Sequence, residues 1–118
     1  MATRIAAFAA FIAVGCTAAA AQDIGGRYRA QCTLQTGLNC SGTAEIVMTS
    51  AKTCSIKWDD GTTGICMLDD TTLSVGFVTH GAAGVGVYEL SADGTLKGVF
   101  IDDYHEKGFG MEKLIPIR

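Results

Sequence analysis

Apolar and polar residues alternate with a period of two along much of this chain, as they do in strands that bury one face. The segment 26–34, for example, places Tyr28 and Ala30 on one face and Arg27 and Arg29 on the other. Turn signals interrupt the alternation about every 8–12 residues. The pattern predicts eight strands, at 26–34, 38–50, 52–58, 62–68, 71–79, 84–90, 95–101 and 108–117.

Short connections between these segments indicate how the strands pair. Turn residues occupy 35–37, 59–61, 69–70 and 91–94, so each strand is expected to pair with its neighbour in a meander. Eight such strands close most naturally into an up-and-down barrel, which leaves no exposed sheet edge. The sequence therefore predicts an all-β fold: a single antiparallel barrel over residues 22–118.

The inner face is clearest in the first half of the chain. It is expected to contain Leu38, Cys40, Gly42, Ala44, Ile46, Met48, Cys54, Ile56 and Trp58. In the second half both faces carry apolar residues. Val85, Val87, Val99 and Ile101 are therefore either ordinary surface residues or an apolar patch for a partner.

Five cysteines separate into Cys16 near the N-terminus and four in the predicted barrel. Four cysteines allow three pairings, and spacing alone does not choose between them. If Gln35-Thr36-Gly37 and Asp59-Asp60-Gly61 are three-residue hairpin loops with glycine in the left-handed conformation, each cysteine falls opposite another. The hairpins thus predict two disulfides, Cys32–Cys40 and Cys54–Cys66. No C-x-x-C pair supports zinc or redox chemistry.

The N-terminus has the pattern of a secretory signal peptide. Arg4 precedes an apolar run at 5–14 that is too short to span a bilayer, and small residues precede Gln22. Cleavage after Ala21 is expected, giving a signal peptide at 1–21 and a periplasmic or secreted domain. Ala13-Val14-Gly15-Cys16 also resembles a lipobox, which leaves a lipid anchor on Cys16 open, and the remaining alternative is a buried N-terminal helix.

Charge narrows the choice of partners. The chain has 9 basic and 12 acidic residues, and loss of Arg4 with the signal changes the formal net charge from −3 to −4. Nucleic-acid binding requires a basic surface, so nucleic acid is not expected as a partner. An anionic membrane surface is disfavoured for the same reason, and membrane attachment is expected only through a lipidated Cys16.

No pattern of a catalytic, metal or cofactor site stands out. His80 and His105 lack the neighbours of a nucleophilic site, and the segment 102–106 (DDYHE) is expected to be a solvated turn rather than a metal site. The glycines at 81–86 do not follow a phosphate-binding pattern and are expected to bend a strand or to admit a close neighbour. Tyr28, Trp58 and Phe77 are expected to be core residues or the lining of a cavity.

Several spacings resemble those of small secreted bacterial proteins known as fibronectin-binding-like proteins. They include Gly26-Arg27-Tyr28-Arg29, the Ile56-Lys57-Trp58 run, the segment 93–98 (DGTLKG) and the segment 110–116 (GMEKLIP). The resemblance covers most of residues 22–118 and implies adhesion to a host matrix protein. Members tend to carry glycine or a polar residue where Cys32 and Cys40 stand here, so the first disulfide departs from the family pattern.

Together these features predict an exported binding module that is not an enzyme and needs no cofactor. The first expectation is protein–protein interaction of an adhesin-like or inhibitor-like kind, with another protein as partner. The alternative is the binding of a small molecule inside the barrel, as calycins do, because an eight-stranded barrel can hold one small ligand.

Overall fold

The computed structural model describes residues 23–118, apart from the side chain of Glu106. The predicted signal peptide at 1–21 and Cys16 lie outside the described residues. Within residues 23–118 no helix is long and apolar enough to cross a membrane.

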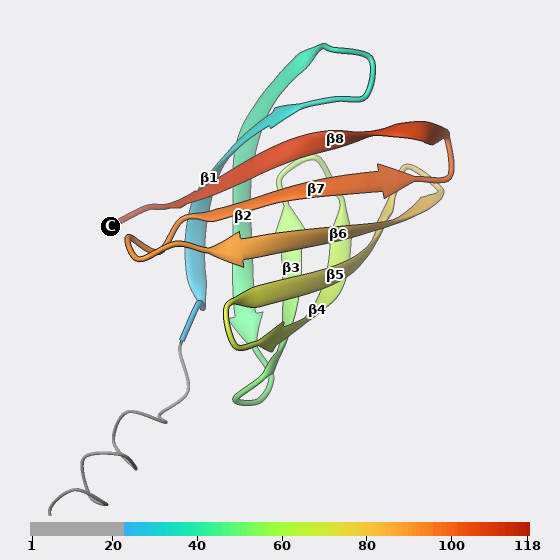
Figure 1. Cartoon of the computed structure of the whole chain (residues 1–118). Coiled ribbons are helices and arrows are strands. Elements are labelled where there is room, and N and C mark those ends of the chain that lie inside the picture. Colours follow the sequence, from blue (N-terminus) through green and yellow to red (C-terminus); the bar gives the residue numbers. More distant parts are fainter. Residues whose placement is uncertain (1–22) are drawn as a thin grey trace, which may run out of the picture.

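Eight antiparallel strands form a closed up-and-down barrel, which confirms the predicted fold (Figure 1). Each strand pairs with the next along the chain, and the last strand pairs with the first. The strands are β1 (Gly26–Thr33), β2 (Asn39–Met48), β3 (Thr53–Trp58), β4 (Thr63–Asp69), β5 (Thr72–Thr79), β6 (Ala82–Leu90), β7 (Leu96–Asp102) and β8 (His105–Pro116).

Three of the hairpin loops share one geometry. In the β1–β2 loop, the amide of Leu34 donates to the carbonyl of Leu38 over 2.8 Å, and Gly37 has a φ of 91°. Gly61 and Gly94 have φ values of 92° and 88° at the equivalent positions of the β3–β4 and β6–β7 loops. Glycine adopts this left-handed conformation without the steric cost that a Cβ atom adds. The loop sequences therefore fix the register of the strands on either side.

That register pairs the cysteines as the hairpins predicted. Cys32 lies opposite Cys40, and Cys54 lies opposite Cys66, with Cα–Cα distances of 4.9 Å in both disulfides. Two disulfides are typical of proteins that fold in an oxidising compartment.

The inner face differs from the expectation in one respect. Leu38 was expected to point inward, but it is 66 % exposed. The reason is that β2 begins at Asn39, so Leu38 belongs to the loop and is not bound by the alternation of the strand.

The core fills one end of the barrel and closes it. The largest fully buried side chains are Ile46, Ile56, Leu73, Leu96 and Leu114. They lie on strand segments next to the β2–β3, β4–β5 and β6–β7 turns or, for Leu114, near the C-terminus. The apolar core therefore occupies this closed end.

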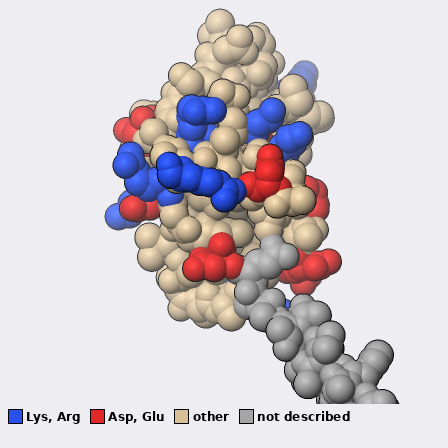
Figure 2. Space-filling model, turned by 90° about the vertical axis from the view of Figure 1, so that its left-hand side faces the viewer, with Lys and Arg blue, Asp and Glu red and all other residues tan. Residues whose placement is uncertain are grey.

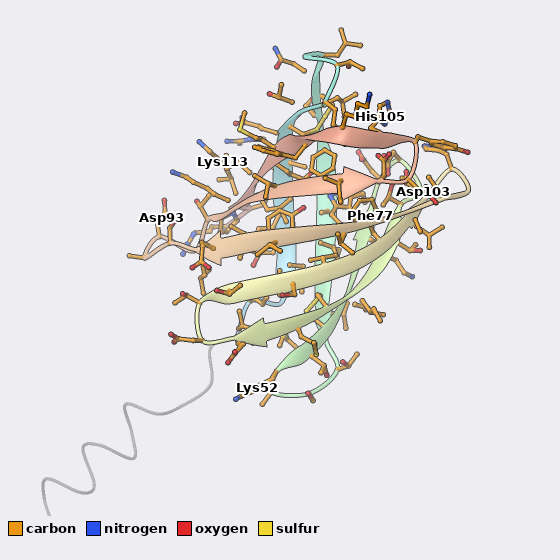
Figure 3. The ribbon with its side chains drawn as sticks, turned by 45° about the vertical axis from the view of Figure 1, so that its right-hand side comes forward. Lys52, Phe77, Asp93, Asp103, His105 and Lys113 are labelled. Carbon is orange, nitrogen blue, oxygen red and sulfur yellow. A yellow bond between two sulfur atoms is a disulfide. The ribbon has the colours of Figure 1, made fainter. Side chains whose placement is uncertain are left out.

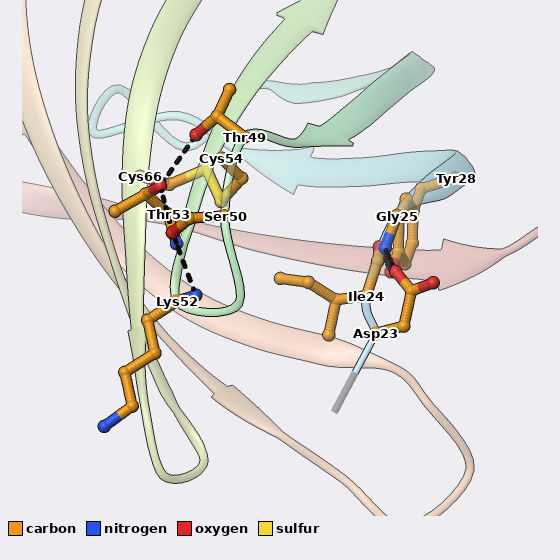
Figure 4. Close-up of a disulfide and its surroundings, with 10 residues drawn as sticks. All are labelled: Asp23, Ile24, Gly25, Tyr28, Thr49, Ser50, Lys52, Thr53, Cys54 and Cys66. Atoms are coloured by element: carbon orange, nitrogen blue, oxygen red, sulfur yellow. Dashed lines mark hydrogen bonds between the residues drawn. A yellow bond between two sulfur atoms is a disulfide. The ribbon is translucent and has the colours of Figure 1, made fainter. Parts of the chain in front are cut away.

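The Cys54–Cys66 disulfide belongs to the closed end (Figure 4). Its two cysteines are buried beside the β2–β3 turn, where the hydroxyls of Thr49 and Thr53 lie 2.7 Å apart. Nearby, the Tyr28 hydroxyl donates to the carbonyl of Ile24 over 2.5 Å, which holds the first described residues against the barrel.

Candidate functional site

The end of the barrel opposite the core contains a cavity of about 370 Å³, called here the mouth cavity. The turns β1–β2, β3–β4, β5–β6 and β7–β8 surround it, because residues of all four contribute to its lining. Figure 3 shows Phe77, Asp103 and His105 toward this end of the barrel, and Lys52 and Asp93 toward the other. The position of the cavity follows from where the large aliphatic residues stop along each strand.

Aromatic rings form much of the cavity wall. Trp58 and Phe77 make an edge-to-face contact with centroids 6.2 Å apart, and Phe77 makes another with Phe100 at 6.3 Å. Tyr88 also lines the cavity, and Tyr104 stands at its rim, 69 % exposed. The wall thus offers apolar ring surfaces rather than the aliphatic packing of the closed end.

Glycines on the neighbouring strands make room for these rings. Phe77 lies opposite Gly84, and a Cβ atom on Gly84 would overlap the Phe77 ring. Phe100 lies opposite Gly110 in the same relation. The glycines of the segment 81–86 thus serve close side-chain contact, in line with their expected role of admitting a close neighbour.

A third pair of this kind brings a polar group into the cavity. The ring of Tyr88 crosses Gly98 on the next strand, where a Cβ atom would lie 2.5 Å from its Cδ2. Beyond Gly98 the Tyr88 hydroxyl donates to Oε1 of Glu112 over 2.7 Å. Any side chain at position 98 would obstruct this crossing.

Glu112 is a half-buried acidic group of this site. Burial raises the pKa of its carboxyl most strongly. The hydrogen bond from Tyr88 and the nearby indole N–H of Trp58 lower that pKa, and the charge of Asp60 raises it. Burial and the Glu112 charge also raise the pKa of Tyr88 far above its ordinary value, so its hydroxyl remains a donor.

The indole N–H of Trp58 is a second polar group of the site. It is buried and has no hydrogen-bond partner of normal geometry, although it approaches Glu112 closely enough to lower the pKa of that carboxyl. A buried donor without a partner costs free energy that an incoming acceptor, from water or a ligand, would recover. The site is therefore built with unused hydrogen-bonding capacity.

The rim of the cavity adds further carboxylates. Asp59 and Asp60 belong to the β3–β4 turn, and Asp102 ends β7. Oδ1 of Asp102 accepts from the backbone amide of His105 and lies 3.1 Å from Nδ1 of its ring. Among the described residues, no three His, Cys, Asp or Glu side chains gather closely enough to hold a metal ion.

The segment 102–106 forms a tighter turn than expected. Asp102 ends β7 and His105 already begins β8, so only Asp103 and Tyr104 connect the two strands. The side-chain Oδ1 of Asp102 accepts from the Tyr104 amide over 3.0 Å, which shapes the turn.

The structure separates the three aromatic residues proposed as cavity lining. Trp58 and Phe77 line the mouth cavity, but Tyr28 does not, because its ring packs in the closed end near Ile24. His80 and His105 both lie at the rim, an arrangement not foreseen from sequence. Glu112, Tyr88 and Phe100 were also missed. The available signal for Glu112 was an acidic residue in register with the inward positions Gly110 and Leu114.

The four residues of the predicted apolar patch lie together on the outer face. Val85 is paired with Ile101 and Val87 with Val99 across β6 and β7. Their exposed fractions are 55 % for Val85, 47 % for Val87, 42 % for Val99 and 43 % for Ile101. Met67 and Met111 extend this patch along the row of Val87 and Val99.

Comparison with known proteins supports the fold alone. No protein-family model matches the sequence, and no curated protein matches it, so the resemblance to fibronectin-binding-like proteins stays a prediction. Solved structures do match. A redesigned β-barrel has a TM-score of 0.68 at 16 % identity, covering 80 % of this chain and 92 % of its own.

Two further structures are similar to this chain in the same way. The redesigned β-barrel mFAP1, bound to DFHBI, has a TM-score of 0.64 at 15 % identity and covers 78 % of this chain and 94 % of its own. A de novo designed fluorescence-activating β-barrel has a TM-score of 0.62 at 15 % identity, and the match covers 83 % of this chain and 97 % of the designed chain. The chain thus has the same barrel fold as these designed proteins.

Proposed function

We propose that this protein is a non-catalytic binding protein that holds one small molecule in the mouth cavity. The observation that carries the proposal is the cavity itself: about 370 Å³ lined by aromatic rings, with a carboxyl group and a free indole N–H inside. Ligand sites in proteins have volumes of about 300–1,000 Å³ and combine apolar walls with a few placed polar groups.

The division of the barrel into two ends supports this proposal. The closed end is filled by aliphatic side chains and by the Cys54–Cys66 disulfide, so a ligand would enter through the mouth. The Cys32–Cys40 disulfide lines the mouth cavity and joins β1 to β2 there. A covalently fixed rim keeps the cavity open in the absence of a ligand, which lowers the entropic cost of binding.

A designed barrel with the same fold offers further support, because it binds a small molecule. The redesigned barrel mFAP1 is bound to DFHBI, so a barrel of this kind is able to hold a small molecule. The signal peptide expected from the sequence and the two disulfides agree with a binding protein that works outside the cytoplasm.

The single tryptophan makes the proposal testable. Trp58 is the only tryptophan of the chain and lies in the cavity wall, so its fluorescence reports on the cavity alone. A screen of small aromatic compounds should yield ligands that change this fluorescence saturably. The variant Ala30→Leu, which adds volume inside the cavity, should weaken the binding at least tenfold.

The matched control is Gln31→Leu, which introduces the same side chain one residue along β1, where it points outward. This control should bind as the wild type does. Equal affinity of the Ala30→Leu variant and the wild type would place the ligand elsewhere and would remove the proposal.

A second candidate function rests on the outer patch of Val85, Val87, Val99 and Ile101. An exposed apolar surface of several neighbouring side chains is typical of protein interfaces. We propose a second copy of this chain as the partner, because the polar residues beside the patch carry complementary charges. Next to Val87 and Val99 on the same two strands, Glu89 on β6 lies opposite Lys97 on β7.

Two copies packed face to face about a twofold axis along the strands would place acidic and basic residues opposite one another. Sedimentation equilibrium should then show a dimer that Val87→Asp dissociates and Thr43→Asp, on the outer face of β2, does not. A monomer at all concentrations would remove this candidate.

A further inference from the structure

We propose that the ligand of the mouth cavity is an organic cation: a compact apolar or aromatic body that carries an ammonium group, with Glu112 as its counter-ion. This inference rests on the proposed function and goes further, because it names the chemical class of the ligand. It is carried by the charges around the cavity, by the surroundings of Glu112 and by the arrangement of the rings.

The charges that line the cavity are predominantly acidic. Of the described residues in its lining, four are carboxylates, namely Asp59, Asp60, Asp102 and Glu112, and none is Lys or Arg. Lys and Arg side chains gather instead on an outer face of the barrel (Figure 2). Acidic groups in a cleft with apolar walls create a negative potential that concentrates cations there.

Glu112 is a carboxylate without a cationic partner in the part of the chain that the structure describes. Among the described side chains, the one contact with salt-bridge geometry joins Nδ1 of His105 and Oδ1 of Asp102. The neighbours of Glu112 are the Tyr88 hydroxyl, which donates over 2.7 Å, and the Trp58 indole. Charged groups removed from water are normally paired. A cation in the cavity would supply the missing pair.

The two neutral neighbours, Tyr88 and Trp58, also fix the position of the Glu112 carboxylate. Tyr88 reaches Glu112 across Gly98, so the carboxyl is held from one side and its remaining lone pairs are left for another donor. An ammonium group offers donors only, or none when it is quaternary, and in both cases its positive charge matches this acceptor. A carboxylate or phosphate ligand would be repelled by the same group.

The rings provide the second element of cation recognition. Trp58, Phe77 and Phe100 follow one another with interplanar angles of 65° and 75°. All three residues line the cavity, and the face of an aromatic ring attracts a cation by about 0.5–2 kcal/mol. Aromatic rings around the cation are the usual means by which proteins recognise quaternary ammonium ligands, and Glu112 adds a negative charge to the same cavity.

The proposal predicts a pH dependence with a definite sign. Cation binding requires the ionised form of Glu112, and burial raises the pKa of this carboxyl above its ordinary value. Affinity for a cation should therefore fall as the pH is lowered through that raised pKa. The groups facing Glu112 are Tyr88, Trp58 and Asp60, and the rim adds other titratable groups, Asp59, Asp102, His80 and His105.

The test compares two probes of nearly identical shape. Benzyltrimethylammonium carries a permanent positive charge, and neopentylbenzene has carbon in place of the nitrogen. Binding of both to the full domain is followed by Trp58 fluorescence and by calorimetry. We expect the cation to bind at least tenfold more tightly, and benzenesulfonate, an anion of similar size, to show no binding.

Two variants test whether the carboxylate of Glu112 is the group that binds the cation. Glu112→Gln should weaken cation binding at least tenfold and leave the affinity for neopentylbenzene within about threefold. The matched control, Glu45→Gln, removes one carboxylate from the outer face of β2 and should change neither affinity. If Glu112→Gln fails to fold, the pH profile of the wild type decides, because the loss of affinity in acid should affect the cation and spare the neutral probe.

The outcomes separate this inference from the proposed function. Equal binding of the charged and neutral probes, or an unchanged cation affinity in Glu112→Gln, overturns the cation inference and leaves the cavity as a binding site. Displacement of the cation by millimolar Mg²⁺ or Ca²⁺ also overturns it, because the carboxylates would then be a metal site. Failure of every probe to bind overturns both proposals.

Discussion

Gly110 on β8 offers a sharp test of how the aromatic wall is built. It lies directly opposite Phe100 on β7, and a methyl group at position 110 would lie 2.8 Å from two ring carbons of Phe100. Real side chains do not make carbon contacts this short. In Gly110→Ala the Phe100 ring must therefore swing toward the cavity, or the two strands must separate.

The expected cost follows from two opposing effects. Overpacking of this kind costs about 1–3 kcal/mol, whereas replacing glycine by alanine in a strand stabilises by about 0.5–1 kcal/mol. The net loss should be about 0.5–2 kcal/mol. Gly76 on β5 is the matched control, because a Cβ atom there meets no atom within 4 Å. Gly76→Ala should be neutral or should stabilise the protein by about 0.5–1 kcal/mol.

Urea unfolding of a double-mutant cycle measures the effect. In a Phe100→Leu background the added methyl group has room, so Gly110→Ala should lose most of its cost, with a coupling of about 1 kcal/mol or more. Gly110→Ala should also weaken any ligand of the mouth cavity, because the displaced ring takes up cavity volume. Equal effects of Gly110→Ala and Gly76→Ala on stability would refute the idea that the glycine makes room for the ring.

Three further predictions concern stability. Cys54→Ala/Cys66→Ala opens a loop with a sequence separation of 12 and should lower the free energy of unfolding in urea by about 3 kcal/mol. A loss below about 1 kcal/mol would contradict this, as would a smaller loss on reduction of the wild type, because reduction opens both disulfides. Burial raises the pKa of Glu112, so the folded state binds a proton more readily than the unfolded state does. The wild type should therefore lose stability as the pH rises from the ordinary pKa of glutamate through the raised pKa of Glu112. The Glu112→Gln variant should lack this pH-dependent loss of stability and should be more stable than the wild type at neutral pH. Parallel plots of stability against pH for the two proteins would contradict the prediction. His80 has a φ of 48° in the β5–β6 turn, so His80→Asn should raise stability by about 0.5 kcal/mol and His80→Val should lower it, as thermal unfolding would show.

Local sequence determined the inner faces of the strands, the register of the hairpins and the pairing of the cysteines. The alternation of residues within one strand is a local property, so it predicts which side chains face inward wherever the strand boundaries are right. A hairpin loop is local as well, because Gly37 and Gly61 fix the loop geometry and the loop fixes the register. For this reason both disulfides followed from a few neighbouring residues. The exception, Leu38, lies where the strand boundary was misjudged.

The mouth cavity was decided by the tertiary structure. Whether an inward position is filled or empty depends on side chains from several strands around the barrel, and no single strand carries that information. The contact between Tyr88 and Glu112 spans three strands and requires a glycine at position 98 in the middle one. Tyr28 and Trp58 both alternate inward and both lie opposite Ala44, yet Tyr28 became part of the core and Trp58 part of the cavity wall. The sequence by itself thus determined an inner face, and the packing of eight strands around it decided which part of that face became core and which became a cavity.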